Sequence, residues 1–157
     1  QAMREKLASI FELQLPSGEK EILTEQEDSL WTVLTQIRAE VTRAIEPERK
    51  SGIVGHSLDT HINLYCSKSL FETLNPVQKT LKEILIVSSL SVKSLPQAPE
   101  QCFQSEEIDG LKISVEHAPG EKCERCWTYS TEINQLEPYL NTCPRCLKTL
   151  HILEKQA

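Results

Sequence analysis

KCERCWTYSTEINQLEPYLNTCPRC, residues 122–146, contains two Cys-x-x-Cys pairs, Cys123/Cys126 and Cys143/Cys146, with sixteen residues between them. Each pair places two thiols close together on a tight turn, and Pro144 helps to fix the second turn because its ring restricts φ. The spacer is long enough to run out and back as a short ribbon or a turn of helix. Four thiolates can then meet at one tetrahedral ion. The spacing therefore predicts one structural Zn²⁺ ion bound by all four cysteines.

Disulfides and a thioredoxin-like redox pair are the alternatives to zinc at these cysteines. We expect no secretory signal peptide, and a redox motif stands once, at the start of a helix that follows a strand. Four sulfur ligands leave no position for water, so the ion is expected to be structural and not catalytic. The segment has few apolar residues, and we expect metal binding and local folding to be one event.

Length and composition fit a small domain followed by a metal module. The chain has 157 residues, of which 39% are hydrophobic and 5% aromatic. No apolar run approaches the roughly eighteen residues of a membrane span, so no membrane contact is expected. Cys66 and Cys102 stand outside the two pairs and are expected to be reduced thiols, as in a cytoplasmic protein. We also expect a monomer.

The net charge of −6 argues against a general nucleic-acid coat. Residues 118–157 carry five basic and five acidic side chains, so a nucleic acid must be bound there by individually placed residues. The chain opens without Met on a helix-compatible stretch, which indicates a fragment of a longer protein.

The order of predicted elements indicates an α+β fold, a small mixed helix and strand domain followed by a four-cysteine zinc-ribbon module. Leu34, Ile37 and Val41 belong to an apolar stripe that predicts a helix over 27–46, which Pro47 should end or kink. We divide the chain into a connector (1–26), an α+β domain (27–117) and a zinc finger (118–157). The further expected elements are an extended arm (10–15), strands (58–66, 86–92 and 111–115), helices (67–74 and one from 75), and an acidic loop (93–109).

No motif for catalysis is present, neither a Gly-rich phosphate loop nor a His-Glu-x-x-His pair, and we expect no catalytic residue in this chain. The four histidines are scattered and are expected to be structural. Better candidates for a functional site, here one that binds nucleic acid, are Arg125, Trp127 and Arg145. Arginine beside a flat aromatic ring is the pairing that stacks on unpaired bases and binds phosphates. The alternative is that Trp127 caps the small core beside zinc while the arginines offset the thiolate charge.

Two stretches together resemble the C-terminal part of bacterial-type isoleucyl-tRNA synthetases. Gly120-Glu121-Lys122-Cys123-Glu124-Arg125-Cys126-Trp127, followed by Cys143-Pro144-Arg145-Cys146, resembles their C-terminal zinc finger. Upstream, Trp31, Leu34, Arg38, Glu40, Val41, Ala44, Glu46 and Arg49, then Val54-Gly55 and Ser57-Leu58, resemble the helix and turn that precede it. The resemblance extends over about residues 28–150.

The resemblance implies a class I ligase that uses ATP to attach isoleucine to its tRNA. ATP and Mg²⁺ would bind in an upstream catalytic domain, and residues 1–26 would be the connection from the helical anticodon-binding domain. The present chain would dock the anticodon side of the isoleucine tRNA and hold one zinc ion. The four cysteines carry over as zinc ligands, and the candidate RNA contacts are Arg43, Arg49, Arg125, Trp127 and Arg145.

Other interpretations remain for particular residues and for the whole chain. Arg43 and Arg49 would otherwise belong to a solvated helix face with Glu40, Glu46 and Glu48 as neighbours. The zinc finger of formamidopyrimidine-DNA glycosylases shares the cysteine spacing and inserts an arginine at DNA. A zinc-ribbon module for protein interaction is the third interpretation, since a net charge of −6 suits nucleic acid poorly.

Overall fold

The first helix and the strand that follows it organise the computed structural model, which describes residues 23–155. The extended arm predicted at 10–15 lies outside the described residues. The elements are α1 (Glu25–Lys50), η3 (Ser57–Asp59), β1 (Thr60–Cys66), α2 (Lys68–Leu74), η4 (Asn75–Val77), α3 (Gln78–Leu85), β2 (Ser89–Ser94), η5 (Leu95–Gln97), β3 (Phe103–Gln104), β4 (Leu111–His117), β5 (Glu121–Lys122), β6 (Tyr129–Ser130) and α4 (Pro144–Glu154).

Helix α1 is defined at its start by a capping box. The Thr24 hydroxyl accepts from the Glu27 N–H, and the Glu27 carboxylate accepts from the Thr24 N–H at 2.9 Å. Pro47 was predicted to end or kink the helix; it does not end it, because the helix continues to Lys50. A proline in the last turn costs the helix one backbone hydrogen bond, and its own carbonyl still accepts from the N–H of Ser51 at 3.0 Å.

The strands of the main domain form one mixed sheet, which within residues 23–155 has four strands in the order β2-β1-β4-β3. β1 and β2 are parallel, and the chain between them passes through α2, η4 and α3. Parallel strands require such a crossover, because a tight turn can join only strands that are antiparallel. β4 returns antiparallel to β1, with Ile62 opposite Val115 and Leu64 opposite Ile113.

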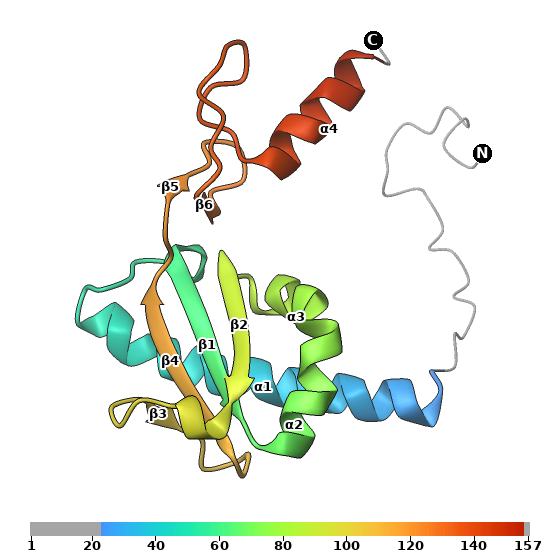
Figure 1. Ribbon diagram of the computed structural model, residues 1–157, viewed down its shortest axis with the longest axis vertical. Coiled ribbons are helices and arrows are strands. Elements are labelled where there is room, and N and C mark those ends of the chain that lie inside the picture. Colours follow the sequence, from blue (N-terminus) through green and yellow to red (C-terminus); the bar gives the residue numbers. More distant parts are fainter. Residues whose placement is uncertain (1–22, 156–157) are drawn as a thin grey trace, which may run out of the picture.

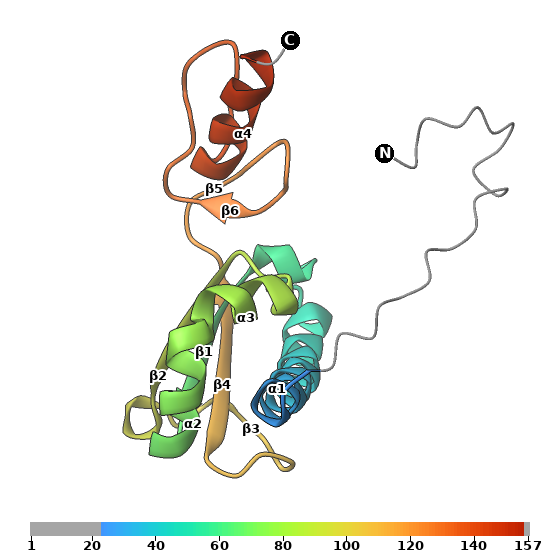
Figure 2. The same cartoon turned by 90° about the vertical axis from the view of Figure 1, so that its right-hand side faces the viewer.

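A single core joins the helices α1, α2 and α3 to one face of this sheet. Ile62 and Leu64 of β1 and Ile113 of β4 are buried in the same cluster as the inward stripe of α1. Figures 1 and 2 show α1 running across this face, with α2 and α3 beside it near β2. The mixed helix and strand arrangement with an appended four-cysteine module confirms the predicted α+β class. Among the described helices, none is both long and apolar enough to span a bilayer.

The opposite face of the sheet is polar. His61 Nδ1 lies 2.6 Å from Ser89 Oγ, and His61 Nε2 lies 3.1 Å from Asn63 Oδ1. The Asn63 amide in turn donates to Ser114 at 3.1 Å and to Glu116 at 3.0 Å. This network satisfies the polar groups of adjacent strands and gives His61 a structural role.

The strand predicted at 86–92 begins three residues later and spans Ser89–Ser94. Ile86 ends α3 in the left-handed conformation, with φ 56°, and its side chain is 49% exposed. A helix that ends this way moves the start of the next strand along the chain. The predicted loop at 93–109 also contains a short strand, β3, which pairs with β4.

Candidate metal centre

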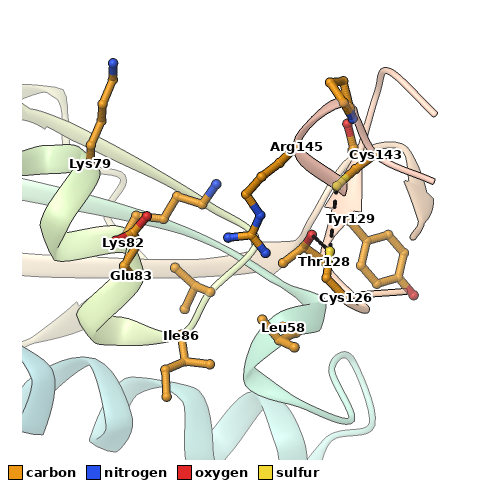
Figure 3. A pocket seen from close by; sticks show the side chains of 13 residues that line it. Leu58, Lys79, Lys82, Glu83, Ile86, Cys126, Thr128, Tyr129, Cys143 and Arg145 are labelled. Atoms are coloured by element: carbon orange, nitrogen blue, oxygen red, sulfur yellow. Dashed lines mark hydrogen bonds between the residues drawn. The ribbon is translucent and has the colours of Figure 1, made fainter. Parts of the chain in front are cut away.

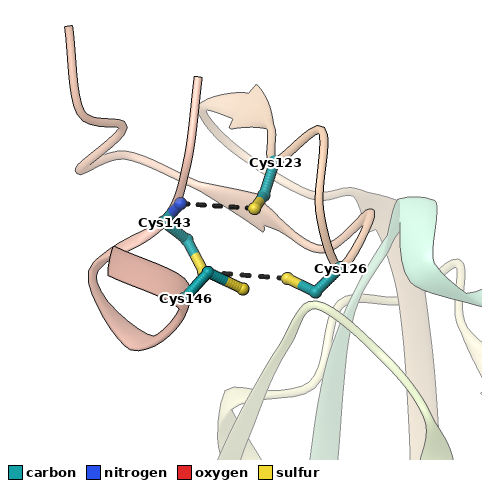
Figure 4. A group of neighbouring side chains, drawn as sticks. All are labelled: Cys123, Cys126, Cys143 and Cys146. Atoms are coloured by element: carbon teal, nitrogen blue, oxygen red, sulfur yellow. Dashed lines mark hydrogen bonds between the residues drawn. The ribbon is translucent and has the colours of Figure 1, made fainter. Parts of the chain in front are cut away.

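The two cysteine pairs lie at the ends of two small elements. The β5–β6 ribbon surrounds Cys123 and Cys126, and α4 begins directly after Cys143. Pro144 occupies the first position of α4, where the missing N–H costs no helical hydrogen bond, so it fixes the turn without weakening the helix. Figure 4 shows the four side chains directed toward one common point.

The four sulfur atoms lie within 4.8 Å of one another. Cys126 Sγ and Cys143 Sγ are 3.7 Å apart, close to the about 3.8 Å that a tetrahedron of about 2.3 Å zinc–sulfur bonds requires. Cys123, Cys143 and Cys146 are buried, and Cys126 is half-buried. None of the described cysteines forms a disulfide. This donor set fits a tetrahedral, thiolate-binding ion with no open position.

Hydrogen bonds stabilise the thiolates of the cluster. The backbone N–H of Cys143 donates to Cys123 Sγ at 3.3 Å, and the Thr128 hydroxyl donates to Cys126 Sγ at 2.9 Å. Burial opposes ionisation of Cys126, but the hydrogen bonds from Thr128, Cys146 and Cys123 together outweigh it and lower the pKa of that thiol to about 6. Burial raises the pKa of Cys146 to about 12, although Arg125 donates to its sulfur.

The two arginines within the pairs reach across to the opposite pair. Arg125 Nη1 lies 3.6 Å from Cys146 Sγ. Arg145 is directed toward Cys126, whose hydrogen bond and negative charge raise the pKa of the guanidinium. Each arginine therefore offsets thiolate charge, as the structural alternative predicted, while both side chains remain exposed.

Trp127 does not cap the core beside the cysteines. Its side chain is 62% exposed, and the apolar contact to the cluster comes from Ile133 instead. Trp127 also adopts φ 65°, a left-handed conformation that costs a non-glycine residue about 1–2 kcal/mol. The turn that closes the first cysteine pair therefore holds an indole ring out in solvent.

Arg43 and Arg49 lie on α1 and are not brought together with the finger residues. Arg43 pairs with Glu40 at 2.7 Å, and Arg49 pairs with Glu46 at 2.8 Å. Glu40 is 2% exposed, so Arg43 compensates a buried carboxylate. Both partners are ones that the solvated-face interpretation named, but Glu40 is buried and so does not belong to a solvated face.

A buried serine joins the finger to the main domain. The Ser88 hydroxyl accepts from the Tyr129 N–H at 2.7 Å and donates to the Leu58 carbonyl. Next to it, the rings of His117 and Tyr129 meet edge to face with centroids 4.8 Å apart. Sequence reasoning missed Ser88, because 41 residues separate it from Tyr129 and no local motif marks it. It also missed Thr128, whose place two residues after Cys126 was the available signal.

Replacing Ser88 by alanine is expected to loosen this joint. The Tyr129 N–H and the Leu58 carbonyl would lose their shared partner, at a cost of about 1–3 kcal/mol. Hydrogen exchange at Tyr129 should accelerate while zinc content stays unchanged. Ser91→Ala is the control, since Ser91 lies on the polar sheet face and 3.5 Å from His61 Nε2. Unchanged exchange at Tyr129 in Ser88→Ala would contradict this role.

Comparison with known protein families separates the alternatives for the whole chain. Residues 120–149 match the family described as "Zinc finger found in FPG and IleRS", which by itself leaves both the glycosylase and the synthetase interpretation open. The curated relatives extend the match far beyond the finger. Over 150 residues the chain is 41% identical to an isoleucine–tRNA ligase of Nitratidesulfovibrio vulgaris. This match covers 96% of the present chain and 16% of that protein.

More distant relatives agree with this match. An isoleucine–tRNA ligase of Desulforamulus reducens is 33% identical over 90% of the chain, and one of Erwinia tasmaniensis is 38% identical over 76%. The chain spans 16%, 15% and 13% of the three relatives. These matches include the main domain as well as the finger. The chain therefore belongs to the isoleucine–tRNA ligase family and corresponds to one segment of its members.

Proposed function

We propose that the chain is the tRNA-docking segment of an isoleucine–tRNA ligase, a class I synthetase that attaches isoleucine to its tRNA at the expense of ATP. ATP and Mg²⁺ would bind in the catalytic domain of the whole protein, and the present residues take no part in catalysis. The partners are the isoleucine tRNA and the other domains of the same protein. The names of the relatives support this proposal. We also propose that the whole protein is monomeric and cytoplasmic.

The metal of the finger is a single structural Zn²⁺ bound by Cys123, Cys126, Cys143 and Cys146. Support comes from the close approach of the four sulfurs and from the zinc-finger family that the segment matches. A site with four thiolates holds no metal-bound water, so zinc here folds the finger and positions its surface residues.

The observation that carries the tRNA proposal is the outward position of Trp127. A strained backbone conformation holds a tryptophan 62% exposed next to the turn of the first cysteine pair, which suggests that the ring is kept there for a binding partner. An unpaired base is such a partner, because stacking on an aromatic ring is worth about 1–3 kcal/mol per base. Arg125 and Arg145, which are exposed within the two cysteine pairs, would contact phosphates.

Binding titrations with three ligands test the proposal. The zinc-loaded chain would be titrated at low salt with isoleucine tRNA, a non-cognate tRNA, and a DNA duplex containing an abasic site. Preference for isoleucine tRNA supports a segment that reads its own substrate, and equal binding of both tRNAs supports a backbone grip. Preference for the damaged duplex, or no binding of either tRNA, refutes the proposal.

Trp127→Ala is expected to weaken tRNA binding by about 1–3 kcal/mol, or roughly 5- to 150-fold, with zinc retained. Trp31→Ala provides the matched control, because Trp31 is also 50% exposed but lies on α1. Fluorescence or filter-binding titrations of both variants would measure the difference. Equal affinities for the two variants would assign Trp127 no RNA contact.

A further inference from the structure

A cleft separates the finger from helix α3 (Figure 3). Its volume is about 800 Å³. One wall carries Lys79, Lys82 and Glu83 of α3, and the other carries Arg145 with the residues around Cys126. The cleft therefore lies directly beside the metal centre, and neither the cysteine motif nor the exposed Trp127 accounts for it.

Positive charge predominates among the side chains that line this cleft. Three cationic residues face one carboxylate, Glu83. In Figure 3, Lys82 and Arg145 extend toward each other from opposite walls. Within residues 23–155, no carboxylate lies within 4.0 Å of the ammonium group of Lys79 or Lys82. Two cations that converge from opposite sides favour an anion between them.

The basic lining continues along α3 beyond this cleft. A second cavity of about 440 Å³ shares Lys79 and Lys82 with the first and extends to Asn75 and Pro76. The two cavities lie on either side of the same two lysines, which is more space than a single small anion needs. Leu58 and the exposed Ile86 add an apolar strip beside the lysines. A path with cations along an apolar strip suits a chain of phosphates that carries bases.

The walls of the cleft are held in a fixed relation to each other. Ser88, three residues after the end of α3, is hydrogen-bonded to Tyr129 of the finger. Trp127 stands between Cys126 and Thr128, both of which line the cleft, so the backbone that carries the exposed indole lies at its border.

We propose that this cleft binds the phosphate backbone of a single RNA strand, with Lys79 and Lys82 as its principal cations and Arg145 on the facing wall. This inference rests on the proposed tRNA function and adds α3 of the main domain to the RNA surface. Arg145 contributes less than a free arginine, because the Cys126 thiolate partly offsets its charge. An acidic protein segment is the competing occupant, and the test below separates the two.

The experiment compares two double variants that remove the same charge. Lys79→Gln/Lys82→Gln changes the cleft, whereas Lys68→Gln/Lys112→Gln changes lysines at the end of the sheet away from the finger. The affinity of the full, zinc-loaded chain for isoleucine tRNA would be measured across a range of salt concentrations. A polyglutamate peptide serves as the acidic protein probe. Zinc content and circular dichroism confirm that both variants are folded.

In the cleft variant the slope of log K against log salt is expected to become less negative by about 1.4, the value for two lost single-strand phosphate contacts. The control variant should keep the wild-type slope. An unchanged slope in the cleft variant, or an equal fall in both variants, would overturn the inference and leave the proposed function standing. Wild-type chain that binds no tRNA would instead refute the proposed function. Polyglutamate binding that is as tight as tRNA binding and is lost in the cleft variant would assign the cleft to an acidic protein.

Discussion

Replacing Cys143 by serine is expected to release the metal and unfold residues 121–154, while α1 and the four-stranded sheet stay folded. Cys143 is a buried member of the sulfur cluster and the N-cap residue of α4, so its substitution removes a ligand directly before the start of a helix. The finger has no other source of comparable stability. Apart from the cysteines, the apolar residue packed on its cluster is Ile133.

The free energy at stake is large. Zinc binding to small four-ligand domains contributes about 10–16 kcal/mol at neutral pH, and an oxygen ligand in place of a thiolate forfeits much of it. Metal analysis and hydrogen exchange would record a fall from one zinc per chain to nearly none, with protection lost in the finger alone. The control is Cys102→Ser, because Cys102 lies outside the cluster. A soluble Cys143→Ser protein with a full complement of zinc would refute this prediction.

Gly120→Ala is expected to have the second largest effect, a loss of about 3 kcal/mol that appears as a roughly 100-fold lower zinc affinity. Gly120 has φ 90°, and a Cβ there would overlap the carbonyl of Ser130 and lie 2.6 Å from the Thr131 nitrogen. Backbone atoms cannot move aside as a flexible side chain does. The ribbon that carries Cys123 would have to shift, and metal affinity reports that shift because binding and folding are linked.

Gly52→Ala provides a matched comparison for this effect. Gly52 also has positive φ, at 80°, but no heavy atom lies within 4 Å of a Cβ built there. It should cost about 1 kcal/mol through backbone strain, with unchanged zinc affinity. Competition with a chelator would measure both variants. Equal zinc affinities would mean that the ribbon tolerates the Cβ, contrary to the expected steric overlap.

The parts of the fold that depend on local patterns could be predicted from the sequence. The spacing of the cysteines predicts their convergence, and the apolar stripe of α1 predicts which face is buried, with Ile37 and Val41 in the core. Strands β1 and β4 follow from alternation of apolar and polar residues. In each case the information lies within one turn, one helix face or one strand.

The features that were missed depend on single backbone conformations or on contacts between distant residues. The left-handed Ile86 displaced β2, because a β-branched residue in that conformation is unexpected from sequence. The helix α4 was not predicted beyond a turn, since Pro144 suggested a bend and not a helix start. The joint between Ser88 and Tyr129 and the cleft beside it arise only when the finger rests on the main domain.

The joint at Ser88 bears on how such a finger can be exchanged between proteins. The finger is one uninterrupted stretch that follows the last strand and carries its own metal-organised fold, and its family occurs in two kinds of protein. The body beneath it contributes the Ser88 hydroxyl, which the Leu58 carbonyl holds in place, together with the ring of His117 and the Asp59 carboxylate, 3.7 Å from Lys122 Nζ. Another protein could therefore acquire the whole finger if it offered a few polar groups beside the end of the strand that leads into the finger. Those groups would fix the orientation of the finger on its new domain.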